Sequence, residues 1–169
     1  MSYRKLNQVT HPFTFPKPLC DDALQDIDTK SRYFIAVDMD SVYWQVATEK
    51  EAHKILESFT PDRKRRCKVI PMGTLNEDPT FIETMMKLQI EWEILSKEHG
   101  LKNVASKIIV DDVLLYGRTS KKILSHFRTV LDVLKHHHAT LKLKKRKWFQ
   151  DRCGFLGMDV TSDGTQPKQ

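Results

Sequence analysis

The chain has 169 residues, 40% of them hydrophobic, which is enough for one medium-sized core and too few for two comfortable domains. Its 28 lysines and arginines exceed its 22 aspartates and glutamates and give a net charge of +6, which suits a polyanionic partner without requiring one. The three cysteines lack CxxC spacing, and neither a membrane-spanning apolar run nor an apolar leader is found, so we expect a soluble intracellular protein with reduced thiols.

The first third of the chain predicts an extended entry, a buried strand and a short helix. Three prolines disfavour regular helix over residues 2–18. The apolar run Tyr33–Val37, which ends at Asp38, predicts a buried strand. Thr48 followed by Glu51 matches a capping box, which predicts the start of a short helix.

The middle of the chain predicts a long helix and a hairpin. Asp78-Pro79 places a capping residue before a proline at the first helical position, and apolar residues then recur at helical spacing to near Gly100. The apolar runs Lys107–Val110 and Val113–Tyr116 flank Asp111-Asp112, which predicts two strands around a two-residue acidic turn. The apolar positions of the helix are Phe81, Met85, Leu88, Trp92 and Leu95.

The last third predicts one more helix and one more strand. The helix begins at Ser120, and Phe155–Val160 reads as a strand before a turn at Ser162–Gly164. The apolar face of the helix consists of Ile123, Phe127, Val130, Leu131 and Leu134. The order of elements predicts an α+β fold, in which helices pack on one face of an antiparallel sheet and leave the other face open.

Three aspartates are the candidate chemical site. Asp38 ends a buried strand and Asp111-Asp112 occupies a hairpin turn, so their side chains can converge on one ion, because neighbouring strands lie about 4.8 Å apart. Crowded carboxylates repel one another unless a divalent cation neutralises them. Two such cations bridged by aspartates are the apparatus of in-line phosphoryl transfer.

A second acidic pair, Asp21-Asp22, shows that the dipeptide alone is uninformative and is often a solvated loop or helix start. The apolar runs on both sides of Asp111-Asp112 distinguish that pair. Because burying two like charges is costly, we interpret it as functional.

Five segments in order resemble the reverse transcriptases of LTR retroelements, most closely the Ty3/gypsy-like branch. Tyr3–Thr10 is similar to "YRKLN-x-VT", and Phe34–Val46 resembles "LD-L-x-SGY-x-Q-I". Pro71–Phe81 is similar to "PFGLTNAPATF", and Ile109–Asp112 stands where that family has its "YxDD" box. Leu141–Gly157 resembles "LKLNPEKC-x-FFQ" followed by "FLG". The resemblance implies a polymerase palm.

The resemblance also implies roles for single residues. Asp38 and Asp111 would be the principal ligands of two Mg²⁺ ions, for which Mn²⁺ could substitute, and Asp112 would be an accessory carboxylate. Tyr43 would be the steric gate that excludes the 2′-hydroxyl of ribonucleotides; without the resemblance it is an ordinary aromatic. Lys145 would act near the pyrophosphate leaving group.

Further residues complete the predicted nucleotide and nucleic-acid sites. Gly73 would let the backbone approach the template base and the incoming nucleotide. Arg4 and Met72 are predicted to belong to the same substrate-binding site. From the residues alone, Met72, Met85 and Met86 are most simply interpreted as core residues. Basic residues that could contact template phosphates, or could form a solvated basic edge, are Arg63, Lys64, Arg65, Arg66, Lys142 and Lys144.

The predicted organisation is one reverse-transcriptase domain over residues 1–169. Residues 1–32 would be a partial fingers and palm entry, and residues 33–169 a palm with a fingers insertion around 47–80, without thumb, RNase H or integrase. The implied activity is RNA-directed DNA polymerisation on an RNA or DNA template with primer and dNTPs, in a cytoplasmic retroelement particle. His136–His138 are expected to be structural or surface residues, because consecutive helical positions point in three directions.

Several positions depart from the family pattern. Val42 replaces the usual glycine, Ile109 replaces the aromatic residue of the "YxDD" box, and Thr74–Asp78 differs from "LTNAP", with Glu77 adding negative charge near the template path. One alternative is a non-catalytic palm relic that acts as a nucleic-acid-binding or protein-interaction module. A palm-type nucleotidyl cyclase is a third possibility, disfavoured because no Gly-Gly-rich acidic turn is present.

Overall fold

The computed structural model describes residues 2–28, 30–59 and 61–167; of the side chains in these ranges, those of residues 21, 42, 58–59 and 143–149 are not described. The chain divides into two compact units. Unit 1 comprises Met1–Lys17 and Ser41–Thr84, and unit 2 comprises Pro18–Asp40 and Met85–Gln169.

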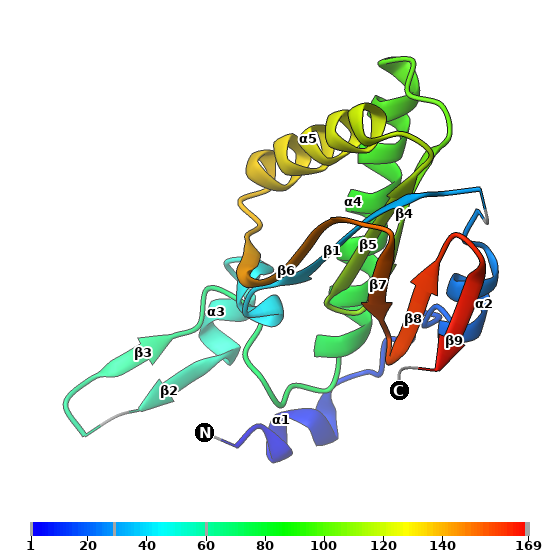
Figure 1. Cartoon of the computed structure of the whole chain (residues 1–169). Coiled ribbons are helices and arrows are strands. Elements are labelled where there is room, and N and C mark those ends of the chain that lie inside the picture. The colour runs from blue at the N-terminus through cyan, green and yellow to red at the C-terminus, as the bar shows by residue number, and fades with distance from the viewer. Residues whose placement is uncertain (1, 29, 60, 168–169) are drawn as a thin grey trace. The chain divides into compact units, whose positions relative to one another are not determined.

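The framework of unit 2 is a four-stranded antiparallel sheet with strand order β4-β5-β1-β6 (Figure 1). The strands predicted over residues 33–37, 107–110 and 113–116 are present, and the central strand β1 is hydrogen-bonded on both sides. The lysine-rich segment near the C-terminus forms the edge strand β6, which was not predicted from the sequence. The strands are β1 (Tyr33–Met39), β4 (Val104–Ile109), β5 (Asp112–Gly117) and β6 (Leu141–Gln150).

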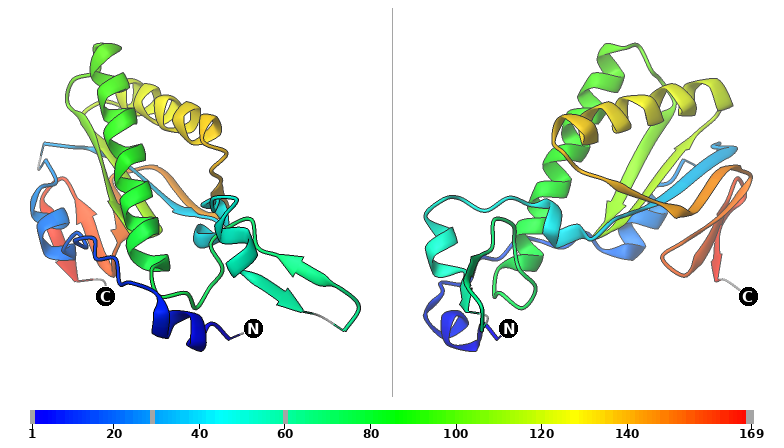
Figure 2. Two further views of the ribbon diagram at one scale, coloured as in Figure 1. Left: turned by 180° about the vertical axis from the view of Figure 1, so that it is seen from behind. Right: turned by 90° about the vertical axis from the view of Figure 1, so that its left-hand side faces the viewer.

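Two helices cover one face of this sheet (Figure 2). Helix α4 (Glu77–Glu98) begins in unit 1 and continues in unit 2, and α5 (Ser120–His136) starts where its sequence predicts. Of the apolar positions predicted to face the core, Leu131 is exposed at 38% and Leu95 is only partly buried. Trp92 is fully buried, and its indole donates a 2.8 Å hydrogen bond to Ser106 Oγ. The expected helical layer is therefore confirmed.

The opposite face of the sheet is partly closed, which corrects the expectation that it is open. Helix α2 (Cys20–Gln25) contributes Leu24 to a buried cluster on that face. The C-terminal region contributes Cys153 and Phe155, from a second sheet of order β7-β8-β9. This small sheet consists of β7 (Arg152–Phe155), β8 (Met158–Thr161) and β9 (Gly164–Pro167).

The predicted single strand over residues 155–160 is wrong, because the chain reverses within it. Leu156 and Gly157 both have positive φ, at 52° and 76°, and they form the turn between β7 and β8. Leucine rarely adopts this conformation, so its preference for extended backbone points away from the turn that is observed.

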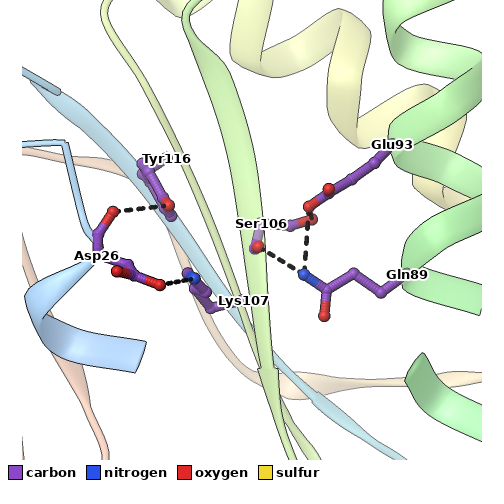
Figure 3. A network of polar contacts seen from close by, with 6 residues as sticks. All are labelled: Asp26, Gln89, Glu93, Ser106, Lys107 and Tyr116. Atoms are coloured by element: carbon purple, nitrogen blue, oxygen red, sulfur yellow. Dashed lines mark hydrogen bonds and ion pairs between the residues drawn. The ribbon is translucent and has the colours of Figure 1, made fainter. Parts of the chain in front are cut away.

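Polar contacts fasten the edge strand β4 on both faces of the sheet (Figure 3). Lys107 forms a 2.7 Å ion pair with Asp26, which follows α2. Gln89 of α4 donates a 2.9 Å hydrogen bond to the backbone carbonyl of Ser106, and Ser106 Oγ lies 3.3 Å from Glu93. Unpaired backbone groups on edge strands invite aggregation, so the bond to the Ser106 carbonyl protects this edge.

Unit 1 consists of short elements around the first turns of α4. The helix α1 (Arg4–Val9) contradicts the predicted extended entry, because the prolines all lie after it. Helix α3 (Ala52–Ile55) begins later than the capping-box pattern predicts and lacks a side-chain cap. The remaining elements are the 3-10 helix η1 (Val42–Gln45) and the hairpin of β2 (Glu57–Phe59) and β3 (Lys64–Arg66).

Helices that could cross a membrane are not found in the described ranges, since none combines sufficient length with sufficient hydropathy.

Candidate active site

Asp38 and Asp112 are direct cross-strand neighbours in unit 2. Asp38 of β1 is paired in register with Asp112 of β5 on one side and with Lys142 of β6 on the other. Directly opposite residues of antiparallel strands project from the same face, with Cβ atoms about 4.5–5.5 Å apart. Both carboxylates are partly exposed. The structure thus brings together two of the three predicted aspartates and one predicted basic residue.

Asp111 occupies the turn between β4 and β5. The turn consists of Val110 and Asp111, one residue earlier than predicted, because Asp112 already pairs with Ile109. Met39, which follows Asp38, donates a 2.8 Å backbone hydrogen bond to the Asp111 carbonyl. The Asp111 side chain is exposed. This contact fixes the turn beside the end of β1, where Asp38 lies.

The turn also carries backbone strain. Val110 has a φ of 56°, a left-handed conformation that β-branched residues rarely adopt. Such outliers cost of order 1–3 kcal/mol and persist only where the surroundings enforce them. Here the apolar strands on both sides supply that constraint, and strained turns of this kind concentrate at functional sites.

The donor set fits a hard divalent cation. Like charges directly opposite each other destabilise a sheet unless they are neutralised, and carboxylate oxygens are the ligands that Mg²⁺ prefers. Within the described ranges, no three His, Cys, Asp or Glu side chains gather closely enough to hold a metal ion by themselves. Mg²⁺ usually takes only one or two carboxylates and completes its shell with water and substrate phosphates, so Asp38 and Asp111 are sufficient in number.

Tyr43 is held by contacts within unit 1. Its ring packs edge-to-face on Phe81, with ring centroids 5.5 Å apart. Its hydroxyl donates a 2.5 Å hydrogen bond to Asp78, and Lys17 lies 3.3 Å from the other oxygen of that carboxylate. The Tyr43 hydrogen bond, followed by that of Lys17, holds the pKa of Asp78 below its usual value. The sequence predicted Asp78 only as a helix cap. The feature that could have indicated its contact with Tyr43 is that Asp78 departs from the "LTNAP" pattern.

Gly73 lies in a turn that requires glycine and is fixed on both sides. Its φ is 93°, a value that side chains disfavour. The backbone N–H donates a 2.6 Å hydrogen bond to Glu77, and the carbonyl accepts a 2.9 Å bond from Asn7 of α1. Glu77, noted above only as added negative charge, therefore orders the Gly73 loop.

The neighbouring nucleotide-site candidates are on the surface of unit 1. Met72 is 63% exposed, so the core alternative is wrong for this residue, whereas Met85 is buried at 2% exposure. Arg4 is exposed at the start of α1.

The basic residues of the β2–β3 hairpin are exposed but mostly paired. Glu57 binds both Lys64 and Arg66, and these contacts, that of Lys64 first, lower the pKa of the Glu57 carboxyl. Arg63 pairs with Asp62 at 2.7 Å. Arg65 has no carboxylate partner among the described residues. An anion that binds this hairpin would therefore meet Arg65 unneutralised by a protein carboxylate.

The remaining predicted basic residues belong to β6. Lys142 is exposed, whereas the side chains of Lys144 and Lys145 lie outside the described residues. The expectation of surface histidines is confirmed for His136–His138, which are all exposed; His137 lies 2.8 Å from Glu91.

A cavity of about 480 Å³ lies within unit 1. Its size is in the range of small-molecule sites. The hydroxyl of Thr48, one of its lining residues, is buried without a hydrogen-bond partner among the described atoms. The segment that follows Ile70 and bears Met72 and Gly73 therefore borders a ligand-sized cavity. Its lining includes Leu6, Asn7, Ala52, Leu56, Ile70, Pro71 and Leu75.

Comparison with known proteins gives consistent results for sequence and fold. A Pol polyprotein from transposon 297 of Drosophila melanogaster is 25% identical over 167 residues, which is 99% of this chain and 15% of that protein. The enzymatic polyprotein of figwort mosaic virus (strain DxS) is 24% identical over 95% of this chain and 22% of its own length. The chain thus spans less than a quarter of the length of these curated relatives.

Solved structures of the foamy viral protease-reverse transcriptase share the fold. The complex with an RNA/DNA hybrid superposes with a TM-score of 0.80 at 18% identity, over 99% of this chain and 21% of that one. A complex with double-stranded DNA gives a TM-score of 0.82. The α+β polymerase fold is therefore confirmed. Residues 1–160 match the family described as "Reverse transcriptase (RNA-dependent DNA polymerase)", and the chain belongs to this family.

Proposed function

We propose that this chain is the fingers and palm part of an RNA-directed DNA polymerase, which extends a primer by two-metal nucleotidyl transfer. The observation that carries the proposal is the pairing of Asp38 of β1 with Asp112 of β5, beside the strained turn at Val110-Asp111. Family membership supports the reaction class. In this assignment unit 2 is the palm and unit 1 is the fingers.

Asp38 and Asp111 would hold the metal ions, with Asp112 as an accessory carboxylate. Bound Mg²⁺ would supply charge neutralisation at the attacking and leaving oxygens of an in-line displacement. The contribution of the protein is preorganisation: the β1–β5 register and the Met39–Asp111 hydrogen bond fix where the carboxylates stand before substrate arrives.

The other residues would bind and orient the substrates. Tyr43 would contact the sugar, while Gly73, Met72 and Arg4 would border the incoming nucleotide. Lys145 would stand near the pyrophosphate and could donate a proton to it. The basic residues would contact template phosphates: Arg63, Lys64, Arg65, Arg66, Lys142 and Lys144.

The proposed partners are a primer-template and dNTPs. The foamy viral proteins of the same fold are described in complex with an RNA/DNA hybrid and with double-stranded DNA. The exposed basic hairpin of unit 1 supports a polyanionic partner for this chain as well.

The test is primer extension on an RNA template with Mg²⁺ and dNTPs. The wild-type chain is expected to extend the primer, and Asp111→Asn is expected to abolish extension. Asp22→Asn is the matched control, because Asp22 belongs to the other Asp-Asp pair and is exposed on α2. Extension that survives Asp111→Asn would contradict the assigned mechanism. Primer-template binding by the wild type without extension, even when fingers and thumb are added, would favour the non-catalytic relic.

A further inference from the structure

Four side chains of unit 1 form a connected group around Tyr43. Tyr43 is in η1, Asp78 and Phe81 are in the first turns of α4, and Lys17 precedes α2 in sequence. The contacts are a 2.5 Å hydrogen bond from Tyr43 to Asp78, a 3.3 Å ion pair from Lys17 to Asp78, and an edge-to-face contact of Tyr43 with Phe81. We call these residues the Tyr43 cluster.

The contacts fix the Tyr43 ring at two points. Phe81 is 1% exposed and so is a rigid support for one side of the ring. Asp78 holds the far end through the hydroxyl, in a hydrogen bond to an ionised acceptor, which is about twice as strong as a neutral one. A tyrosine held at its ring and at its hydroxyl cannot swing to another rotamer without breaking one of these contacts.

Asp78 is itself held in place. It lies in the first turn of the 22-residue helix α4, where the helix dipole favours a negative charge, and Lys17 binds its second oxygen. The hydrogen bond from Tyr43, followed by the contact with Lys17, lowers the pKa of the Asp78 carboxyl and so favours its ionised form. In the family segment that Pro71–Phe81 resembles, the corresponding position is proline, whose side chain has no hydrogen-bond acceptor.

We infer that Asp78 is a positioning residue that fixes the Tyr43 ring and thereby sets the discrimination between deoxyribonucleotides and ribonucleotides. The inference rests on the proposed function, in which Tyr43 contacts the sugar. A steric gate excludes a 2′-hydroxyl only as far as its ring resists displacement. Asp78 supplies that resistance through the hydroxyl, and Lys17 supports Asp78 from the other side.

A merely structural role for Asp78, as a charge at the N-terminus of α4, gives different expectations. Its loss would then weaken α4 and reduce use of dNTPs and rNTPs alike. A positioning role instead requires a change in the ratio of kcat/KM for dNTPs to kcat/KM for rNTPs. It also requires that Tyr43→Phe and Asp78→Ala change this ratio through loss of the same contact.

The experiment compares kcat/KM for a dNTP and for the matching rNTP in single-nucleotide incorporation with Mg²⁺. Tyr43→Phe and Asp78→Ala are each expected to reduce the dNTP/rNTP ratio about tenfold, as expected for one charge-assisted hydrogen bond. The double variant should show no more loss than the larger single one. Asp78→Asn should retain most of the discrimination because its amide oxygen still accepts, and Lys17→Met should have a smaller effect. Asp132→Ala, at an exposed position on α5, is the control and should leave the ratio unchanged.

A second measurement separates this inference from the proposed function. Equilibrium binding of dCTP and CTP, which differ only at the 2′-hydroxyl, is measured with Mg²⁺ by calorimetry on the same variants. If the wild type does not extend primers but prefers dCTP, and Asp78→Ala loses that preference, the proposed catalysis fails and the inference stands. If Tyr43→Phe lowers the dNTP/rNTP ratio and Asp78→Ala leaves it unchanged, the inference is overturned and the proposed polymerase function is unaffected. Equal binding of dCTP and CTP by an inactive wild type overturns both.

Discussion

The two ends of one face of the unit 2 sheet have opposite characters. Three successive same-face pairs run along β1 and β5: Phe34 with Tyr116, Ala36 with Leu114, and Asp38 with Asp112. The first two pairs belong to or border the buried cluster closed by α2 and the small sheet. The third is acidic and partly exposed. The same strands therefore provide a core at one end and the candidate metal site at the other.

This division explains how the sheet tolerates two like charges in register. Cross-strand pairs of like charge destabilise a sheet by a few tenths of a kcal/mol up to about 1 kcal/mol, whereas burying one large apolar side chain contributes about 1.5–3 kcal/mol. Burial of the apolar side chains at one end therefore stabilises the sheet by more than the like-charge pair at the other end destabilises it. Sites of function commonly depart from local stability rules in this way and rely on the rest of the fold.

Truncation at the apolar end should have the largest effect on stability. Leu114 is fully buried, so Leu114→Ala is expected to lower the free energy of unfolding by about 2–5 kcal/mol through lost contacts and a residual cavity. Urea denaturation measures the change, and Leu131→Ala, at a 38% exposed position, is the comparison. A loss below about 1 kcal/mol for Leu114→Ala would show that this end is not the stabilising one.

Acid should destabilise the opposite, helical face. His126 is buried against Ser96, and its Nε2 has no partner among the described atoms; burial lowers its pKa to about 4. The unfolded chain therefore takes up the proton more readily, so the full stability holds above pH 6.5 and is lost as the pH falls towards 4. The loss is about 3 kcal/mol between pH 7.5 and pH 4, by order of magnitude.

The measurement is urea denaturation across that pH range. A double variant, Ser96→Ala with His126→Leu, removes the buried imidazole and its partner together and should flatten the pH dependence. His136→Gln, at an exposed histidine, should leave it intact. If the free energy of unfolding of the double variant falls with pH as steeply as that of the wild type, groups other than His126 cause the loss of stability.

Neutralising one carboxylate at the acidic end should change the stability of the protein little in the absence of metal. Asp38→Asn removes the like-charge repulsion with Asp112 together with the attraction to Lys142 on its other side, so the free energy of unfolding is expected to change by no more than about 0.5 kcal/mol in the presence of EDTA. Excess Mg²⁺ should raise the free energy of unfolding of the wild type more than that of Asp38→Asn, because the variant has lost one of the proposed metal ligands. Equal stabilisation of both proteins by Mg²⁺ would argue against Asp38 as a ligand.

The sequence predicts the parts of this arrangement that local periodicity encodes. The apolar runs locate β1, β4 and β5, and helical spacing locates α4 and α5, including the buried Trp92. The three aspartates stand out because apolar residues surround them. In each case the pattern arises from burial of one face, which leaves a period of 2 or 3.6 in the sequence.

Other features depend on contacts between residues distant in sequence, which no local pattern encodes. Tyr43 and Asp78 are 35 positions apart, and Lys107 and Asp26 are 81 apart. Strand β6 was missed because its lysine-rich sequence resembles a solvated loop, and it pairs with β1 through irregular register. The small C-terminal sheet was missed because its first turn uses a leucine in a left-handed conformation.

The most direct test of the central claim is the occupancy of the site by Mn²⁺, measured by electron paramagnetic resonance with primer-template and dNTP present. The wild type is expected to bind Mn²⁺, and both Asp38→Asn and Asp111→Asn should lose most of that bound signal, whereas Asp22→Asn should retain it. Undiminished Mn²⁺ binding in Asp38→Asn and Asp111→Asn would contradict the assignment of these aspartates as the metal ligands.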